Sequence, residues 1–323
     1  MGISEKGPAP AFEQVLRRVS VRELRLLLAV ARAGNMMKAA QDAGLSQPAV
    51  SKAIAGLESA FGTRLFDRDN RGVQPTPQGQ IVIRRARLMF EEIRQAVEEI
   101  GFLASAASGE LRVGATPSAS AGLLAHAIGL LASSHPGLRY HAVEMEAGQL
   151  AAEVRDRTLD FAVGRDPGAR MEDDLIFEPL FQDRVLVVAG DQHRVAKRRA
   201  LRLDELVGEE WILPPEGSAV GREIEVAFAR RKLALPQARI TLMSTLMRYE
   251  LLATQRYVTV LHGSLLRFGR PPSYIRVLPV DLGASVNTGL LRSRGRTLSP
   301  AAELLMDQLR ALGKALAQRK AVA

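Results

Sequence analysis

Four side chains in the stretch AAQDAGLSQPAVSKAI, residues 39–54, could together contact the edges of DNA base pairs. The amide of Gln47 can pair bidentately with adenine, and the ring of Pro48 can touch a thymine methyl group. Ser51 can bond to several acceptors, and Lys52 can reach guanine or a phosphate. The same residues could also form the solvated face of an ordinary helical hairpin, so the pattern alone leaves both interpretations open.

Two helices joined by a short turn would be needed to present these side chains. Such a pair requires a small residue inside the first helix, a glycine in the turn and apolar residues on the inner face of the second helix. Ala40, Gly44, Leu45, Val50 and Ala53 supply them in that order. The spacing therefore predicts a helix-turn-helix.

Helix caps mark the boundaries of three consecutive helices. Ser20 and Glu23 have the spacing of a capping box, and Gly34 is suited to end the helix that follows them. Asn35 is expected to cap the second helix and Ser46 the third, which is predicted to run to about residue 60. Asn35 and Ser46 are also candidate DNA contacts, because a helix start faces the duplex in this arrangement.

A β-hairpin is predicted next, since the turn signal DNRG at residues 69–72 separates two short extended runs. Arg68 and Arg71 would then point toward phosphates or a minor groove, although solvated turn arginines would look the same. Thr76 is expected to cap the following helix, with Pro77 at its first position, and is another candidate DNA contact.

A long helix is predicted from residue 77 to about 103, with one apolar seam and charged flanks. A single seam favours pairing with a second copy of the chain, whereas burial in one globule would need a broader apolar face. Packing on its own chain remains the alternative. Small residues at 104–109 would end the helix as a hinge. The candidate dimerisation residues are Val82, Ala86, Met89, Ile93, Val97 and Ile100.

The remaining residues alternate short β-rich runs with helical stretches, which predicts α/β units with mainly parallel sheets. Strands are expected at 111–115, 138–143, 161–164, 185–189, 211–213, 240–243 and 257–261. Helices are expected at 123–132, 149–157, 221–232 and 246–253.

Ligands of such sheets bind beyond the carboxyl ends of the strands. Polar side chains follow several predicted strands, and together they favour a small anionic or polyhydroxylic ligand, although each one alone could be a plain helix cap. The candidate ligand-binding residues are Thr116, Ser118, Ser120, Arg165, Ser218, Ser244, Thr245 and His262.

Composition excludes several alternatives. The 323 residues include no cysteine, which removes thiol and zinc-finger chemistry, and the net charge of +9 favours polyanionic partners. The five histidines lack metal-ligand spacing, and no hydrolase elbow, phosphate loop or dinucleotide fingerprint is present, so an enzyme with an accessory helix-turn-helix is disfavoured. A small-molecule-binding protein without DNA-binding activity is the other alternative. With neither a signal peptide nor a membrane-length apolar run apparent, we expect a cytoplasmic protein.

The run AGNMMKAAQDAGLSQPAVSKAIAGLESAFGTRLFDRDNRGVQPTPQG resembles the winged helix-turn-helix and linker helix of LysR-type transcriptional regulators. The layout of the remaining residues is similar as well. Two departures stand out: Asn35-Met36-Met37 replaces a usual Ser-Phe pair, and Pro75 replaces a usual leucine after the wing. The first would alter one phosphate contact and the second would stiffen the exit of the wing.

The resemblance implies a multidomain α+β protein with a periplasmic-binding-protein-like effector domain. An N-terminal extension would span 1–19, the winged helix-turn-helix 20–75, the linker helix 76–108 and the effector domain 109–323. Subdomain I would comprise about 109–178 and 281–323, and subdomain II about 179–280. The extended stretches 175–180 and 275–280 would be the two crossovers between them.

The resemblance also implies partners. A homodimer would bind an interrupted inverted repeat in promoter DNA, and two dimers would form a homotetramer that bends it. RNA polymerase is a candidate partner. The effector would be a small co-inducer such as an aromatic acid or a sugar derivative, with no cofactor, metal or catalytic residue.

Overall fold

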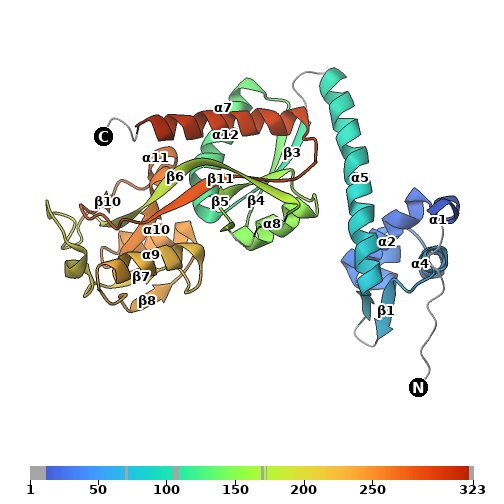
Figure 1. The fold of residues 1–323 in the computed structure, drawn as a ribbon, viewed down its shortest axis with the longest axis horizontal. Helices are drawn as coiled ribbons and strands as arrows, with labels where there is room; N and C mark the ends of the chain where they lie inside the picture. Colours follow the sequence, from blue (N-terminus) through green and yellow to red (C-terminus); the bar gives the residue numbers. More distant parts are fainter. Residues whose placement is uncertain (1–11, 70–71, 105–108, 169–170, 172, 320–323) are drawn as a thin grey trace. The chain divides into compact units, whose positions relative to one another are not determined.

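The computed structural model of the chain describes residues 12–69, 72–104, 109–168, 171 and 173–319 (Figure 1). The chain folds into two compact units, of which the first ends at Ala96 and the second begins at Val97. None of the helices in these ranges is long and apolar enough to cross a bilayer.

Four helices and a hairpin precede the long helix of the first unit. Ser20 and Glu23 form the predicted capping box, with the backbone amide of Ser20 donating to Glu23 Oε2 at 2.9 Å. Gly34 ends the next helix in the left-handed conformation, at φ 62°. The helices are α1 (Phe12–Arg18), α2 (Val21–Ala33), α3 (Met36–Asp42) and α4 (Gln47–Phe61).

One apolar cluster holds these helices together. The buried face of α4 carries Val50, Ile54 and Leu57, spaced by three or four residues as a helix face requires. They pack with Leu27 and Ala39 of the two preceding helices, and all five residues are fully buried. Gln47, Pro48, Ala49 and Lys52, at the start of α4, lie outside this core and are exposed.

The wing consists of β1 (Phe66–Asp69) and β2 (Gly72–Pro75), which pair antiparallel as predicted. Glu58 of α4 accepts hydrogen bonds from the backbone amides of Leu65 at 2.8 Å and Phe66 at 3.3 Å. The amide of Val73 donates to the carbonyl of Gly34 at 2.9 Å. These bonds fix the hairpin to the ends of α4 and α2.

The second unit is built on one nine-stranded mixed sheet. Its strand order is β4-β3-β5-β11-β6-β9-β7-β8, and β10 pairs with β6 outside this order. The strands are β3 (Gly109–Ala115), β4 (Leu138–Glu144), β5 (Phe161–Arg165), β6 (Leu175–Gly190), β7 (Trp211–Leu213), β8 (Ala238–Thr241), β9 (Val258–His262), β10 (Ile275–Val277) and β11 (Ser285–Ser293). We call the part around β3, β4 and β5 the first lobe and the part around β7, β8 and β9 the second lobe.

Helices cover both faces of the sheet in each lobe, as Figure 1 shows. In the first lobe, the core beneath α7 and α12 lies on one face and the core beneath α8 on the other. In the second lobe, α9 covers one face while α10 and α11 cover the other. The helical segments are α6 (Pro117–Ala119), the π-helical η1 (Ser120–Leu124), α7 (Ala125–Ser134), α8 (Ala147–Arg155), the 3-10 η3 (Leu203–Leu206), α9 (Ala219–Arg230), α10 (Thr245–Ala253), α11 (Gly263–Phe268) and α12 (Pro300–Arg319).

The connection between the lobes differs from the expected one. The predicted extended runs 175–180 and 185–189 are parts of the single strand β6, whose first part, from Leu175 to Arg184, pairs antiparallel with β11 at every residue except Leu180. The expected second crossover at 275–280 is wrong: Ile275–Val277 pairs with the far end of β6 inside the second lobe. The chain returns to the first lobe through β11 instead.

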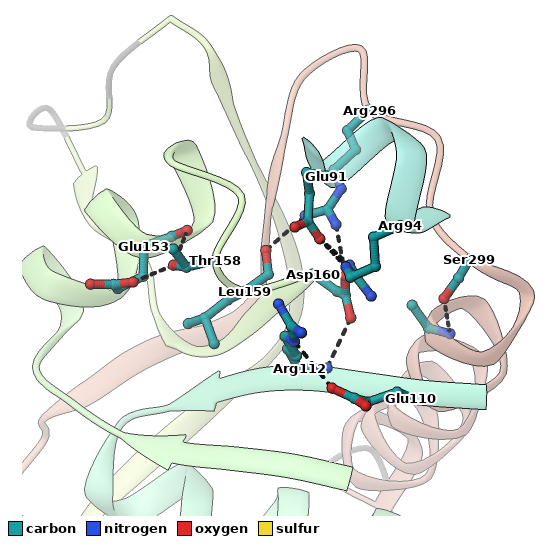
Figure 2. Close-up of polar contacts among 11 residues, drawn as sticks. Glu91, Arg94, Glu110, Arg112, Glu153, Thr158, Leu159, Asp160, Arg296 and Ser299 are labelled. Carbon is teal, nitrogen blue, oxygen red and sulfur yellow. Dashed lines mark hydrogen bonds and ion pairs between the residues drawn. The ribbon is translucent and has the colours of Figure 1, made fainter. Parts of the chain in front are cut away.

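A buried ion pair ties the segment before α12 to the first lobe (Figure 2). Arg296 donates to the carbonyl of Leu159 at 2.8 Å and to Asp160 Oδ1 at 2.7 Å. The other carboxylate oxygen of Asp160 accepts from the backbone amide of Arg112 on β3 at 2.8 Å. Both charged side chains of the pair are 2% exposed, so the ion pair is buried as well as hydrogen-bonded.

Candidate functional site

The first turn of α4 presents the predicted polar surface. Gln47, Pro48 and Lys52 are exposed and Ser51 is half-buried, while Val50 and its apolar neighbours face the core. Ser46 caps the helix, with its hydroxyl oxygen 3.4 Å from the amide of Ala49. A turn with so few charges that faces solvent suits hydrogen bonding to base edges.

Asn35 lies at the start of α3 and is exposed. Its side-chain oxygen accepts hydrogen bonds from the amides of Met37 at 2.8 Å and Lys38 at 3.1 Å. The residue therefore caps α3 as predicted, and its amide group is the part that could meet a phosphate.

Thr76 does not fit its predicted role as a DNA contact. The residue is buried, and its hydroxyl donates to the carbonyl of Arg64 at 2.8 Å while accepting from the amide of Gly79 at 2.9 Å. It joins the wing to α5 (Pro77–Ala104), so its hydroxyl is used inside the protein. The side chain of Arg68 and the whole of Arg71 lie outside the described residues.

The apolar seam of α5 divides into two parts. Val82 packs against the core of the first unit, and Ala86 is buried at 3% exposure, so these two serve the chain's own fold. Met89 is half-buried. Ile93, Val97 and Ile100 are exposed at 48%, 65% and 67%, so the free part of the predicted seam is its C-terminal half.

A pocket lies where the carboxyl ends of strands from both lobes meet. Its empty volume is about 460 Å³, including the space at its mouth. Five of the predicted ligand-binding residues line it together: Thr116, Ser118, Arg165, Thr245 and His262. Pro117, Pro214, Val220, Met243, Arg248, Val260, Leu261 and Leu265 complete the lining.

Three predicted residues are not part of this lining. Ser218 caps α9 by accepting from the amide of Gly221 at 3.0 Å, and Ser244 caps α10 by accepting from the amide of Met247 at 3.2 Å. Ser120 begins the π-helical η1. The serines at these helix starts were predicted as ligand contacts, and the hydroxyl oxygens of Ser218 and Ser244 each accept a hydrogen bond from the helix that the residue caps.

Arg165 enters the pocket from the end of β5 in the first lobe. Its Nη2 lies 3.7 Å from Glu146 Oε2, whereas its Nε and Nη1 have no hydrogen-bond partner. Burial is the main cause that lowers the pKa of this guanidinium; Glu146 opposes the shift and Arg222 adds to it. An arginine remains charged despite such lowering, so an incompletely paired cation lines the pocket.

Arg248 enters from α10 in the second lobe and was missed in the sequence. Its guanidinium donates to the carbonyls of Leu242 at 3.0 Å and Val260 at 3.4 Å, while its Nε has no partner. Burial lowers its pKa to about 10. The available signal was its position four residues before the buried Leu252, because a charged residue on a core-facing helix stripe is rare without a special role.

His262 ends β9 and lies near both arginines. Burial, followed by the charges of Arg165 and Arg248, lowers the pKa of its imidazole to about 3. The ring is therefore neutral at physiological pH, and its Nε2 has no hydrogen-bond partner. Thr116, which follows β3, adds an unpaired buried hydroxyl to the same pocket.

A wing beside an exposed helix suits binding to duplex DNA, and a two-lobed α/β fold with a polar pocket at its strand ends suits binding of a small molecule. One chain holds both. This combination defines a ligand-responsive DNA-binding protein.

Comparison with known families identifies the class more closely. The model described as "Bacterial regulatory helix-turn-helix protein, lysR family" matches residues 21–80. The model described as "LysR substrate binding domain" matches residues 104–314. The chain therefore belongs to the LysR family of DNA-binding transcriptional regulators.

Relatives and solved structures agree with this assignment. The HTH-type transcriptional regulator GbpR of Azospirillum brasilense is 30% identical over 305 residues, which cover 94% of this chain and 89% of that protein. Full-length CbnR complexed with its target DNA has a TM-score of 0.66 at 18% identity, covering 91% of this chain and 99% of the other. A full-length OxyR from Pseudomonas aeruginosa also has a TM-score of 0.66, at 22% identity, with coverage of 90% and 95%.

Proposed function

We propose that this regulator reads promoter DNA through the first turn of α4 and that it responds to a small effector in the pocket between the lobes. The observation that carries the DNA part is the division of α4 into a buried apolar face and an exposed face bearing Gln47, Pro48 and Lys52. We assign the protein to the cytoplasm, where its DNA target lies, and we assign it no catalytic step.

Replacing Gln47 with alanine should weaken binding to the specific promoter site by about 1–3 kcal/mol, because a bidentate contact to a base edge is lost. Binding to random DNA should change little. Fluorescence anisotropy with a labelled fragment from upstream of the protein's own gene, at fixed salt concentration, would measure both affinities.

The matched control is Gln237→Ala, which removes an exposed glutamine from the second unit and should leave both affinities unchanged. Equal losses of Gln47→Ala on specific and random DNA would rule out base readout by this residue. Failure of the parent protein to bind the fragment at low salt would contradict the choice of DNA target.

Two copies are proposed to pair through the exposed half of the α5 seam, so that two α4 helices reach half-sites of an interrupted inverted repeat. Two dimers would form a tetramer that bends the promoter, and RNA polymerase would be the next partner. The support for pairing is the row formed by Ile93, Val97 and Ile100, whose exposure on one helix face calls for an apolar partner.

Introducing aspartate at Ile93 should shift the sedimentation coefficient toward a smaller species, because a carboxylate cannot be buried unpaired at the centre of an apolar seam. Sedimentation velocity at several protein concentrations would show the shift. Gln80→Asp is the control, since Gln80 is an exposed α5 residue outside the seam and carries the same substitution. A pattern identical to the parent's for Ile93→Asp would contradict pairing through this surface.

The proposed effector is a small anionic or polyhydroxylic molecule held by Thr116, Ser118, Arg165, Thr245 and His262. These residues come from both lobes, so a ligand that prefers one arrangement of the lobes would shift the population toward it. The change in DNA binding or bending would then follow from that differential affinity.

A further inference from the structure

The pocket between the lobes contains more polar side-chain atoms than its own residues satisfy by hydrogen bonds. Unpaired atoms include Nε and Nη1 of Arg165, Nε of Arg248, Nε2 of His262 and Oγ1 of Thr116. These residues are 8%, 8%, 8% and 2% exposed, and all four line the same pocket. Buried polar groups are rarely left without a partner, so this cluster indicates a missing ligand.

The charge balance of the pocket is strongly positive. Two guanidinium groups line it, and its lining, as far as the chain is described, includes no aspartate or glutamate. Glu146 lies near one of these groups, at 3.7 Å from Arg165 Nη2, but its side chain is 46% exposed and does not enter the lining. A buried and incompletely paired cation is unfavourable, and a bound anion would remove that penalty.

The lining also discriminates against a sugar. Each sugar hydroxyl donates a hydrogen bond, and carboxylate or amide oxygens are the side-chain groups that accept it most effectively. The described lining provides neither Asp, Glu, Asn nor Gln, whereas its two arginines suit the planar oxygens of a carboxylate. Met243, Val260 and Leu265 add an apolar surface that an organic body could cover.

We infer that the effector is a small organic acid with an apolar body, whose carboxylate lies between Arg165 of the first lobe and Arg248 of the second. The inference rests on the proposed effector role of this pocket and narrows it to one chemical class. Arg248 thereby becomes a residue that determines ligand specificity. A neutral His262 offers a hydrogen bond without adding a third positive charge.

Bridging of the two arginines by one carboxylate also explains how the ligand would favour one arrangement of the lobes. Arg165 ends β5 of the first lobe and Arg248 belongs to α10 of the second lobe, so a separation of the lobes would move the two cations apart. A carboxylate that contacts both arginines binds more tightly when the two lobes are close together than when they are separated. The free energy available for the switch equals this difference in affinity.

Matched acid and amide pairs test the chemical class directly. Full-length protein would be titrated with benzoate, benzamide, cyclohexanecarboxylate, cyclohexanecarboxamide, galactose and sulfate, by thermal shift and by isothermal titration calorimetry. We expect at least one acid to bind at least about ten-fold more tightly than its amide, galactose and sulfate. Equal binding of acid and amide, preference for galactose, or no binding by either acid would overturn the inference.

Substitutions of Arg248 test its role in binding the acid. Arg248→Met should weaken binding of the tighter acid by about 10- to 150-fold, because it removes a hydrogen bond to a charged group. Arg248→Lys should recover part of the loss by restoring the charge, which a purely structural role would not explain. Arg230→Met removes an exposed arginine from α9 and is the matched control.

Arg165→Met is the second variant, and it keeps the test decisive if Arg248→Met fails to fold. Parent-like affinity for the acid in either folded variant would overturn the carboxylate clamp. Acid binding to both variants is measured by calorimetry on folded protein in the absence of DNA. Loss of acid binding can therefore be told apart from failure of the proposed DNA-binding function, which the Gln47 variant tests separately.

Discussion

Replacing Arg296 with methionine should lower the free energy of unfolding of the effector domain by about 3–5 kcal/mol. The substitution removes the charge that faces Asp160 across 2.7 Å and leaves that carboxylate buried, at 1% exposure for the residue. It also removes the hydrogen bond to the carbonyl of Leu159. Urea denaturation followed by circular dichroism and by fluorescence of Trp211, the single tryptophan, would measure the loss.

Arg294→Met provides the control, because Arg294 is exposed and two residues away, with one hydrogen bond to the carbonyl of Asp173 at 2.8 Å. Its effect should stay within about 0.5 kcal/mol. Adding Asp160→Asn to Arg296→Met should recover part of the stability, since the buried negative charge that faced Arg296 is then removed as well. Unfolding of the single Arg296 variant at the parent's urea midpoint would contradict a stabilising role for this ion pair.

Acidification from about pH 7 to about pH 5 should destabilise the effector domain by about 2 kcal/mol through His262 alone. The folded-state pKa of His262 is lowered to about 3, mainly by burial, whereas the unfolded residue has its ordinary value near 6.5. The unfolded chain thus takes up a proton below about pH 6.5 while the folded protein does not. The stability is fully present above that pH and is lost as the pH falls toward about 3.

The His262→Gln variant isolates this contribution. Its free energy of unfolding should fall less than the parent's over the same pH range, by about 2 kcal/mol, in urea titrations at each pH. His141→Gln, at an exposed position of β4, should retain the parent's pH dependence. Parallel pH profiles for the parent and His262→Gln would show that the histidine takes up its proton without unfolding.

Local signals were sufficient to predict α2, α3 and α4, whereas α1 (Phe12–Arg18) lies in the expected N-terminal extension and was not predicted. The capping box at Ser20, the cap at Asn35 and the left-handed Gly34 act within one turn of chain, so the residues that determine them are neighbours in the sequence. Thr76 was predicted correctly as part of a helix start, but its hydroxyl is hydrogen-bonded inside the protein, which does not favour its predicted DNA contact. Its burial depends on Arg64, twelve residues away across the wing.

The effector pocket could be predicted only in part. Arg165 and His262 were found because each follows a predicted strand, and the carboxyl ends of strands converge in α/β folds. Arg248 was missed because it lies within a helix, and its approach to the pocket depends on how α10 packs against β9. Ser218 and Ser244 also follow predicted strands, but in the structure each caps the helix that comes next and neither lines the pocket.

The fusion of two predicted runs into β6 has a mechanical consequence. Because the residues of β6 from Leu175 to Arg184 pair with β11, the lobes are joined by a two-stranded ribbon in place of a loose tether. Such ribbons deform by changing their twist, and their pairing is weakest at an irregularity. The register shift between Thr288 and Gly289 is such a point. A ligand that changes the arrangement of the lobes would therefore twist this ribbon.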